Sequence, residues 1–444
     1  MLIGKWKYLP VLSAAVLLLC GCANETADDS QNDTANDANT IKIGLIVPFS
    51  GECAAYGASA TKGVELAVHE INAEGGVLGK EIRILTRDSR TDPLYASLKA
   101  KQLITDEGVI AILGADASGV TYETMRTIIY WGLNAFLISG AASAIDLTSD
   151  DTEDIFYRTV PHSEYEAKIL SKYILTSATS PSDSIVSVIY VDELYGDNFF
   201  REFSDWFTDP GRGGTIASSV AFEMGKVSYA AEIEALLNDT LYIDTTNNDT
   251  IIISNPRVIL VSYPRSGAQI IRDWKASGYP ARWYLTSGMK AEEFIVSAGN
   301  TNVEGMSIIA PFNNGDSYIN NFARLYENYW LEDPEMHRCI EHWYDATILL
   351  AYAILRADTL DPMVIKESLE PVSRDGTPVT VGQFSEGKEL IQGGIDINYE
   401  GASGPVDLNT EGDLRYDSGD GFKYHRWTIN GGAFSYKEQL SALP

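Results

Sequence analysis

The apolar positions of this chain switch repeatedly between the spacing of a strand and the spacing of a helix. A short apolar run, Ile41 to Val47, precedes apolar residues at helical intervals, namely Val64, Ala67, Val68 and Ile71. Ile82 and Ile84 then alternate with charged residues, as in a half-buried strand. This order predicts a strand, a helix and a second strand, paired in parallel with a right-handed crossover. The loop from Pro48 to Gly57 lies at the end of the first strand, where open α/β sheets bind ligands.

The same alternation continues along the chain and predicts two α/β domains with parallel sheets. Further strands are expected at residues 109–113, 135–139, 185–191, 214–222, 258–262, 283–286, 306–311 and 425–429. Helices are expected at residues 94–105, 120–131, 197–207, 230–237, 267–277, 318–330, 340–356 and 363–369. Residues 238–255 are rich in Asn, Asp and Thr, and we interpret them as a polar surface insertion.

The N-terminus predicts export. Lys5 and Lys7 precede an apolar run, Leu9 to Leu19, which is short for a membrane span and suits a signal peptide. The run ends in Leu19-Cys20-Gly21-Cys22, which resembles the lipobox of bacterial lipoproteins, although Cys20 replaces the usual small residue. This resemblance implies a signal peptide over residues 1–21 and a lipid anchor on Cys22; an ordinary secretory signal is the alternative. Residues 22–40 are polar and acidic, so we predict a disordered tether.

Charge and cysteine content narrow the classes of function. The chain carries 33 basic and 62 acidic residues, a formal charge of −29, which argues against a nucleic-acid partner. Cys53 and Cys339 are the two cysteines of the predicted mature domain, and in an oxidising compartment we expect them to form a disulfide.

Motifs for catalysis and cofactor binding are weak. There is no G-x-S-x-G motif and no G-x-G-x-x-G motif after the first strand, and the glycine-rich turn at residues 75–80 continues with Glu81 where a P-loop needs Ser or Thr. Metal-ligand types are present at His337, Cys339, Glu341 and His342, but only His337 and Glu341 share a helix face. We therefore expect no catalytic residues, no cofactor and no metal.

Small and hydroxyl residues follow three of the predicted strands. These pairs are Ser50-Gly51, Ala117-Ser118 and Ala142-Ser143. Each pair precedes a predicted helix, and free N–H groups at a helix N-terminus favour an anion such as a carboxylate. A serine in such a place is commonly a helix cap, but three pairs at one sheet edge favour a binding site.

The mature chain resembles the branched-chain amino acid binding family of periplasmic solute-binding proteins, the two-lobed type I receptors of ABC importers. The segments that carry the resemblance include IGLIVPFSGECAAYG, GVELAVHEINAEGGVLGKEI, FLISGAAS, FYRTVPHSEYEA, VDELYGDNF, WYDATILLAYAI and YEGASGPVDLNTEGD. It implies two Rossmann-like lobes, residues 41–160 plus 312–415 and residues 161–311 plus 416–444. It also implies hinge strands near residues 158–161, 309–312 and 413–422, an ABC permease as partner, and a monomer.

The resemblance also places a ligand site. It assigns ligand contacts to Tyr56, Ser118, Ala142, Ser143, Tyr195, Tyr263 and Gly288, with Ser50 and Ala117 as further candidates. Amino acid receptors of the family have an acidic residue at the position of Gly288, which holds the ligand ammonium. Either Glu292 reaches into the site, or the ligand lacks an α-ammonium, because a buried ammonium without a partner is costly. We favour a small or aromatic carboxylate-bearing ligand over an amino acid.

Two other functions remain open. The same fold also serves as the ligand-sensing subunit of a signalling partner. An enzyme would need a catalytic group in the cleft, for which Lys290 and His162 are the candidates. We expect an exported, lipid-anchored protein on the periplasmic or cell-surface side of a membrane.

Overall fold

The computed structural model of the 444-residue chain describes residues 39–237, 241–244, 249–252, 256–312, 317–415 and 423–441. The predicted signal peptide and Cys22 lie outside these residues, and β1 begins at Thr40, the last residue of the predicted tether. Within the described part of the chain, none of the helices combines the length and the apolar character that crossing a bilayer requires.

The first sheet contains five parallel strands in the order β2-β1-β3-β4-β5. Its strands are β1 (Thr40–Val47), β2 (Glu81–Asp88), β3 (Ala111–Gly114), β4 (Phe136–Ser139) and β5 (Phe156–Arg158). The last five residues of β1 are all buried, which explains its continuous apolar run. A central strand of a parallel sheet is covered on both faces, so it does not alternate with polar residues.

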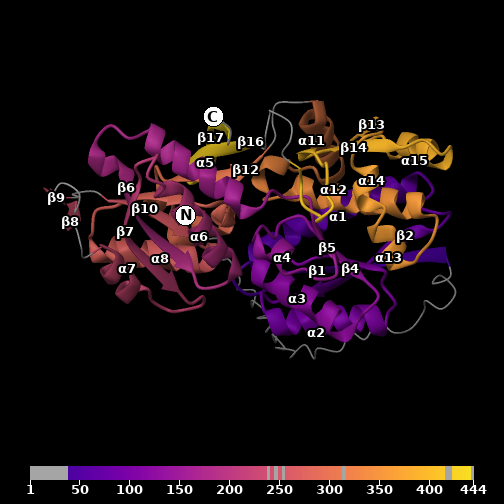
Figure 1. Ribbon diagram of the computed structural model, residues 1–444, viewed down its shortest axis with the longest axis horizontal. Coiled ribbons are helices and arrows are strands. Elements are labelled where there is room, and N and C mark those ends of the chain that lie inside the picture. The colour runs from indigo at the N-terminus through magenta and orange to yellow at the C-terminus, as the bar shows by residue number, and fades with distance from the viewer. Residues whose placement is uncertain are drawn as a thin grey trace, which may run out of the picture. The chain divides into compact units, whose positions relative to one another are not determined.

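Helices from both ends of the chain surround the first sheet, and together with it they form what we call the first module. They are α1 (Ala54–Ala73), α2 (Pro93–Thr105), α3 (Ser118–Trp131), α4 (Asp146–Ser149), α11 (Ser317–Trp330), α12 (Ile340–Ala357), α13 (Pro362–Lys366), α14 (Leu369–Val372) and α15 (Phe384–Gln392). Figure 1 shows α12 beside α1, and α12 is buried from Ile340 to Leu355. Gly63 permits this packing, because a Cβ there would lie 2.5 Å from the carbonyl oxygen of Ile340.

The second sheet has seven strands in the order β17-β16-β12-β11-β10-β6-β7. Its strands are β6 (Ile185–Val191), β7 (Thr215–Phe222), β10 (Arg257–Val261), β11 (Arg282–Leu285), β12 (Ser307–Pro311), β16 (Lys423–Asn430) and β17 (Ala433–Ser441). The strands from β7 to β12 are parallel, whereas β16 and β17 add to the edge in antiparallel fashion (Figure 1). The edge strand β17 was not predicted from the sequence.

The second module consists of the second sheet and six helices. They are α5 (Ser163–Thr176), α6 (Leu194–Phe207), α7 (Ala230–Leu237), α8 (Pro264–Ser277), α9 (Glu292–Ala298) and α10 (Asn300–Val303). Within the predicted polar insertion, β8 (Leu241–Asp244) and β9 (Asp249–Ile252) form an antiparallel hairpin. The rest of that insertion lies outside the described residues.

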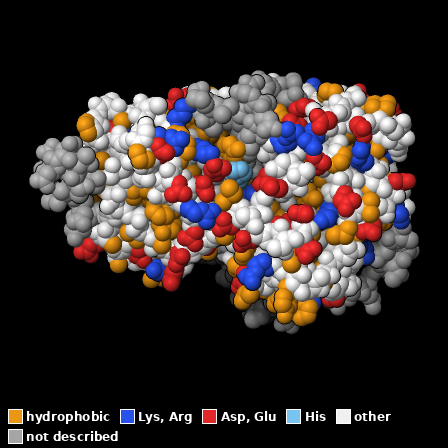
Figure 2. All heavy atoms as spheres, viewed as in Figure 1, with side chains coloured by type: hydrophobic (Ala, Val, Ile, Leu, Met, Phe, Trp, Pro, Cys, Tyr) orange, Lys and Arg blue, Asp and Glu red, His pale blue; other side chains and the backbone are white. Residues whose placement is uncertain are grey.

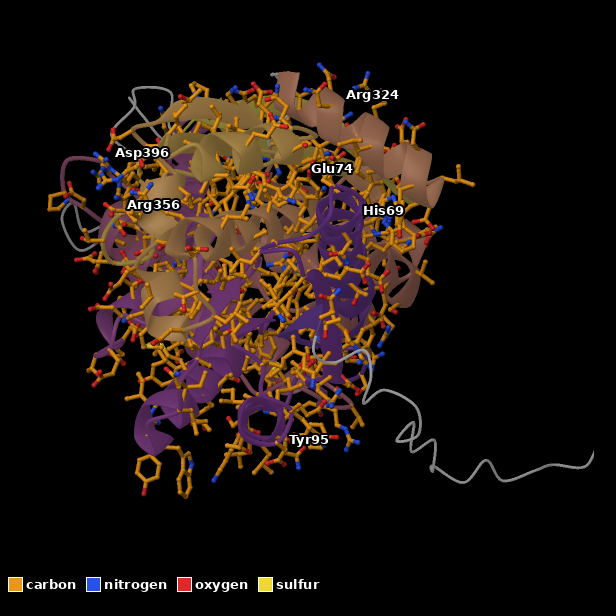
Figure 3. The ribbon with its side chains drawn as sticks, turned by 90° about the vertical axis from the view of Figure 1, so that its right-hand side faces the viewer. His69, Glu74, Tyr95, Arg324, Arg356 and Asp396 are labelled. Atoms are coloured by element: carbon orange, nitrogen blue, oxygen red, sulfur yellow. The ribbon has the colours of Figure 1, made fainter. Side chains whose placement is uncertain are left out.

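Smaller elements complete the chain. Strands β13 (Thr377–Thr380), β14 (Ile397–Gly401) and β15 (Gly404–Pro405) form a three-stranded sheet, and the 3-10 turns are η2 (Pro181–Ser184), η3 (Ser287–Met289) and η4 (Pro334–Met336). The helix predicted at residues 363–369 is confirmed over residues 363–366 as α13, and its extension to residue 369 is wrong, because α14 is a separate short helix. An ion pair between Arg356 and Asp396 joins α12 to the segment before β14 (Figure 3).

The predicted fold class, an α/β fold with parallel central sheets, is confirmed. Acidic and basic side chains are interspersed on the face shown in Figure 2. Of the three predicted hinge strands, the third falls partly outside the described residues, and the hinge itself stays a prediction.

A buried ion pair joins Arg158 of β5 to Asp413, which lies in the segment after β15. Arg158 is fully buried, and its Nε lies 2.5 Å from Oδ1 of Asp413. The same guanidinium donates to the carbonyl oxygen of Ala144 at 2.8 Å and to Thr148. Removing one member of a buried pair leaves the other charge uncompensated.

We therefore predict that Arg158→Met lowers the free energy of unfolding by about 3–5 kcal/mol in urea denaturation. Arg126→Met is the control, because Arg126 is mostly exposed and its pair with Glu123 at 3.1 Å should contribute less than about 1 kcal/mol. Equal losses in the two variants would contradict a stabilising role for the buried pair.

Candidate functional site

The loops after β3 and β4 meet at the carboxyl edge of the first sheet. The Ser139 hydroxyl donates to the carbonyl oxygen of Ala115 at 2.8 Å and accepts the N–H of Ala142 at 2.9 Å. The Ser118 hydroxyl accepts the N–H of Ala144 at 3.2 Å. These bonds bring Ser118 and the loop that contains Ser143 together, as the sequence predicts. The N–H of Ala142, unlike that of a free helix N-terminus, already donates to the Ser139 hydroxyl.

The N-terminus of α3 binds a carboxylate from the second module. Ala117 precedes the helix in an extended conformation and provides no side-chain cap. The N–H of Gly119 instead donates to Oε2 of Glu193 at 3.1 Å. A helix N-terminus stabilises negative charge through its free N–H groups and its dipole. This end of α3 is therefore suited to an anion.

Two tyrosines of the second module surround the same carboxylate. The Tyr263 hydroxyl donates to Oε1 of Glu193 at 2.7 Å, and the N–H of Tyr195 donates to the same oxygen at 3.1 Å. The two tyrosine rings lie 5.7 Å apart, and both residues are buried. Tyr195 lies in the first turn of α6, so the segment VDELYGDNF supplies both a tyrosine and a buried acid.

Tyr56 connects the two modules on the other side of the site. Its hydroxyl donates to the carbonyl oxygen of Gly288, and the Arg338 guanidinium lies 4.7 Å from the centre of its ring. Arg338 also pairs with Asp116 at 3.2 Å. Residues predicted separately from distant segments, Tyr56 and Gly288, are thus in direct contact.

Packing explains why position 288 carries glycine instead of an acid. A Cβ at Gly288 would lie 2.5 Å from the carbonyl oxygen of Ser262 and 3.2 Å from the Tyr195 ring. There is no room for a carboxylate side chain at this position. Glu193, which sequence reasoning missed, is one of the buried acids of this region. Its place two residues before Tyr195 in the recognised segment was the signal that could have found it.

Two further contacts join the modules. Oε2 of Glu52, in the loop after β1, accepts both the N–H of Ser266 at 2.9 Å and its hydroxyl at 2.7 Å, at the N-terminus of α8. Asp146 of α4 pairs with Arg201 of α6 at 2.8 Å. Ser50, a candidate ligand contact, instead donates its hydroxyl to Asp88 at 2.7 Å, within the first module.

Burial strongly affects the acids of this site. Burial raises the pKa of Glu193 to about 7, although its hydrogen bonds from Tyr263, Tyr195 and Gly119 act in the opposite direction. Burial likewise raises the pKa of Glu166 to about 7, opposed by hydrogen bonds from Ser287. Burial also raises the pKa of Asp116, and the charge of Arg338 opposes this shift.

A small cavity opens beside Tyr56. It has a volume of about 210 Å³ and is lined by residues of both modules, including Tyr56, Ser59, Lys290, Glu292, His337 and Arg338. Glu292, one explanation offered for the missing acid, is exposed at this cavity. The candidate catalytic groups are separated, because His162 lines a different cavity with Asp413 and Thr148.

The predicted disulfide is wrong in this structure. Cys53 and Cys339 are both buried free thiols. Cys53 directly precedes the first residue of α1, and Cys339 adopts a left-handed conformation directly before α12. Burial raises the pKa of both thiols, so each is held in the neutral form that packs as a small apolar group.

The residues weighed as metal ligands do not converge. His337 contacts Ser59 at 3.1 Å and Glu332 at 3.2 Å, whereas Nδ1 of His342 bonds to the carbonyl oxygen of Thr159 at 2.5 Å. Among the residues that the structure describes, there is no group of three or more His, Cys, Asp or Glu side chains with the arrangement of a metal site.

Comparison with known proteins identifies the family. The profile of the periplasmic binding protein family matches residues 40–394, and the chain therefore belongs to this family. Its fold is that of the type I members, with parallel sheets in a mixed α/β arrangement.

Individual relatives have a low sequence identity to this chain but match most of its length. The chain is 23% identical to the chemotactic signal transduction system substrate-binding protein BasB of Halobacterium salinarum, over 83% of each protein. It is 25% identical to the leucine-, isoleucine-, valine-, threonine- and alanine-binding protein of Pseudomonas aeruginosa, over 75% of this chain and 82% of that protein.

Solved structures agree on the fold. A leucine binding protein, LivK, from Thermotoga maritima superimposes with a TM-score of 0.71 at 20% identity, over 90% of this chain and 99% of that one. A solute-binding protein from R. palustris in complex with benzoate superimposes with a TM-score of 0.67 at 16% identity, over 91% of this chain and 97% of that one.

The raised pKa of Glu166 predicts a pH dependence of stability. A folded-state pKa of about 7 exceeds the value of 4.5 for an ordinary glutamate, so the folded state favours the protonated form. The stabilisation from this group is complete below the unfolded pKa and is lost as the pH rises through the folded pKa. At 1.36 kcal/mol per pKa unit, the loss is about 3 kcal/mol.

We predict that Glu166→Gln removes this part of the pH dependence, because glutamine stays neutral. Denaturant unfolding at pH 5 and pH 8 should show the wild-type protein losing about 2.5 kcal/mol more than the variant. Glu292→Gln is the control, because Glu292 is exposed. If the free energy of unfolding has the same pH dependence in Glu166→Gln and in wild type, the Glu166 carboxyl is not protonated in the folded state at pH 5.

Proposed function

We propose that this protein is an extracytoplasmic solute-binding protein that captures a small carboxylate-bearing ligand between two lobes and delivers it to an ABC permease. The first and second modules are the cores of these lobes, residues 41–160 plus 312–415 and residues 161–311 plus 416–444. The protein acts as a monomer, and a lipid anchor on Cys22 holds it at the membrane.

The observation that carries this proposal is that residues of both modules meet at the N-terminus of α3. Ser118 and the Ala142–Ser143 loop come from the first module, and Tyr195 and Tyr263 come from the second. Hydroxyl and N–H donors are suited to a carboxylate, and tyrosine rings are suited to the rest of a small molecule. Such a ligand stabilises the closed arrangement because it contacts both modules at once.

Both an amino acid and an organic acid fit this proposal. Neighbouring structures with the same fold are described in complex with isoleucine and with benzoate. The glycine at position 288 removes the usual partner of an α-ammonium, but Glu193 supplies a buried carboxylate nearby. Glu193 already accepts three hydrogen bonds, so an ammonium would have to share it.

A ligand-sensing role is the second candidate. It is favoured by the similarity to BasB, which is described as a substrate-binding protein of a chemotactic signal transduction system. Uptake assays in cells that lack the gene separate the two roles. Loss of uptake of the bound solute supports transport, whereas normal uptake with a lost response to that solute supports sensing.

Binding itself is tested by thermal unfolding with a panel of amino acids, dicarboxylates and aromatic acids. A ligand at 100 times its dissociation constant stabilises the folded protein by about 2.7 kcal/mol, which gives a clear shift of the midpoint. A panel without any shift, or turnover of a bound compound, would contradict the proposed function.

We predict that Ser118→Ala weakens binding of the best carboxylate in the panel by about 10- to 100-fold, because a hydrogen bond to a charged group is lost. Titration calorimetry measures this change. Ser97→Ala is the matched control, because Ser97 is also buried in a helix of the first module but bonds to the carbonyl oxygen of Pro93. Unchanged affinity in Ser118→Ala would exclude Ser118 as a ligand contact.

A further inference from the structure

The cavity beside Tyr56 is lined by two cationic side chains from different modules. Lys290 follows η3 in the second module, and Arg338 precedes α12 in the first. Lys290 is 6% exposed, and the Arg338 side chain is 9% exposed. Charged groups are rarely buried so deeply without a partner of opposite charge.

The close neighbours of the Lys290 ammonium are aromatic rings. Its ammonium lies 4.3 Å from the centre of the Trp427 ring and 5.3 Å from that of Phe312. Its Nζ donates to the carbonyl oxygen of Glu335 at 3.4 Å, and within the described ranges no carboxylate lies within 4.0 Å of it. Aromatic faces stabilise a cation by about 0.5–2 kcal/mol, which offsets only part of the cost of burial.

Arg338 is only partly satisfied. Nη1 pairs with Asp116 at 3.2 Å, and the guanidinium covers the Tyr56 ring. Its Nε is buried and has no hydrogen-bond partner among the residues that the structure describes. A guanidinium presents its donors in a planar fork that matches a carboxylate, so an unpaired Nε marks a suitable position for one.

We propose that the ligand carries a second acidic group, held by Lys290 and Arg338, and that the substrate class is therefore the short dicarboxylates, with or without an amino group. This inference rests on the proposed function, in which Ser118 and Ser143 hold the first carboxylate. It adds Lys290 and Arg338 as residues that determine specificity.

Arg338 is linked through Asp116 to the segment that contains Ser118. Asp116, which pairs with Arg338, precedes Ser118 by two residues, and two residues span at most about 7 Å of extended chain. The cavity volume of about 210 Å³ is below the range of about 300–1,000 Å³ typical for drug-sized ligands. The small volume of this cavity favours a short ligand.

Among the described residues, the acids in and around this cavity leave Nζ of Lys290 and Nε of Arg338 without a carboxylate in direct contact. Glu293 forms an ion pair with Arg265 at 3.0 Å, and Glu292 is exposed at the rim, where solvent screens its charge. Asp116 is engaged with one side of Arg338 only. Glu341 is buried near Lys290 and forms no ion pair within 4.0 Å in the described part of the chain.

Calorimetry with dicarboxylates and singly acidic compounds tests the proposal. Succinate, glutarate and L-glutamate are compared with butyrate and with L-glutamine, the neutral amide of glutamate. We expect at least one dicarboxylate to bind about 10- to 100-fold more tightly than its singly acidic counterpart. Lys290→Met and Arg338→Gln should each reduce this ratio about tenfold.

Two surface cations provide matched controls. Lys275 lies 4.4 Å from the Trp274 ring and Arg212 lies 3.7 Å from the Trp206 ring, and both are exposed. Lys275→Met and Arg212→Gln should leave the ratio unchanged. Lys290→Met retains an apolar chain among the aromatic rings. It therefore provides a folded variant if Arg338→Gln destabilises the protein by leaving Asp116 without its partner.

The outcomes separate this inference from the proposed function. If singly acidic compounds bind as tightly as the dicarboxylates, or if Lys290→Met leaves the ratio unchanged, the second acid site is wrong and the binding function stands. If none of the amino acids, dicarboxylates and aromatic acids binds, both are wrong. A dicarboxylate preference that is lost in Lys290→Met supports the second acid site.

Discussion

The arrangement of the site depends on helix N-termini whose N–H groups donate to a carboxylate of the opposite module. Glu52 of the first module bonds to the N-terminus of α8, and Glu193 of the second bonds to the N-terminus of α3. In both cases a negative charge meets free N–H groups and the positive end of the helix dipole. These two reciprocal contacts hold the modules in the position that brings Tyr56 to Gly288.

The same geometry makes the site suitable for an exchangeable anion. Glu193 lies beside Ser118, so the region that holds a protein carboxylate already has the donors that a ligand carboxylate needs. Burial raises the pKa of Glu193 to about 7, which means that its charge is only weakly favoured there. A ligand that brings its own negative charge to this edge therefore competes with a carboxylate that is costly to keep ionised.

Most of the fold could be predicted from the sequence, because buried parallel strands have continuous apolar runs. The predicted strand at residues 185–191 coincides with β6, and Ile41 to Val47 matches β1 within one residue. The missed strand β17 lies at a sheet edge and is largely exposed, so its apolar signal is weak. The turn that precedes it contains Gly431 and Gly432, both with positive φ, and this pair after Asn430 was a usable hairpin signal.

The site was less predictable, because its charges come together from distant segments. Serines at strand ends could be grouped because parallel strands end at one edge of a sheet. Lys290 and Arg338 are separated by 48 residues and belong to different modules, so no local pattern relates them. The sequence alone indicates a missing acid at position 288, whereas the structure shows that the close approach of Tyr195 and Ser262 requires glycine there.

The most direct measurement is a crystal structure of the protein with the carboxylate that binds most tightly. We expect a carboxylate of that compound within hydrogen-bond distance of the Ser118 hydroxyl and of the Ala142–Ser143 loop, with Tyr195 and Tyr263 against its other side. A compound that contacts one module alone, or that lies outside this region, would contradict capture between the two modules.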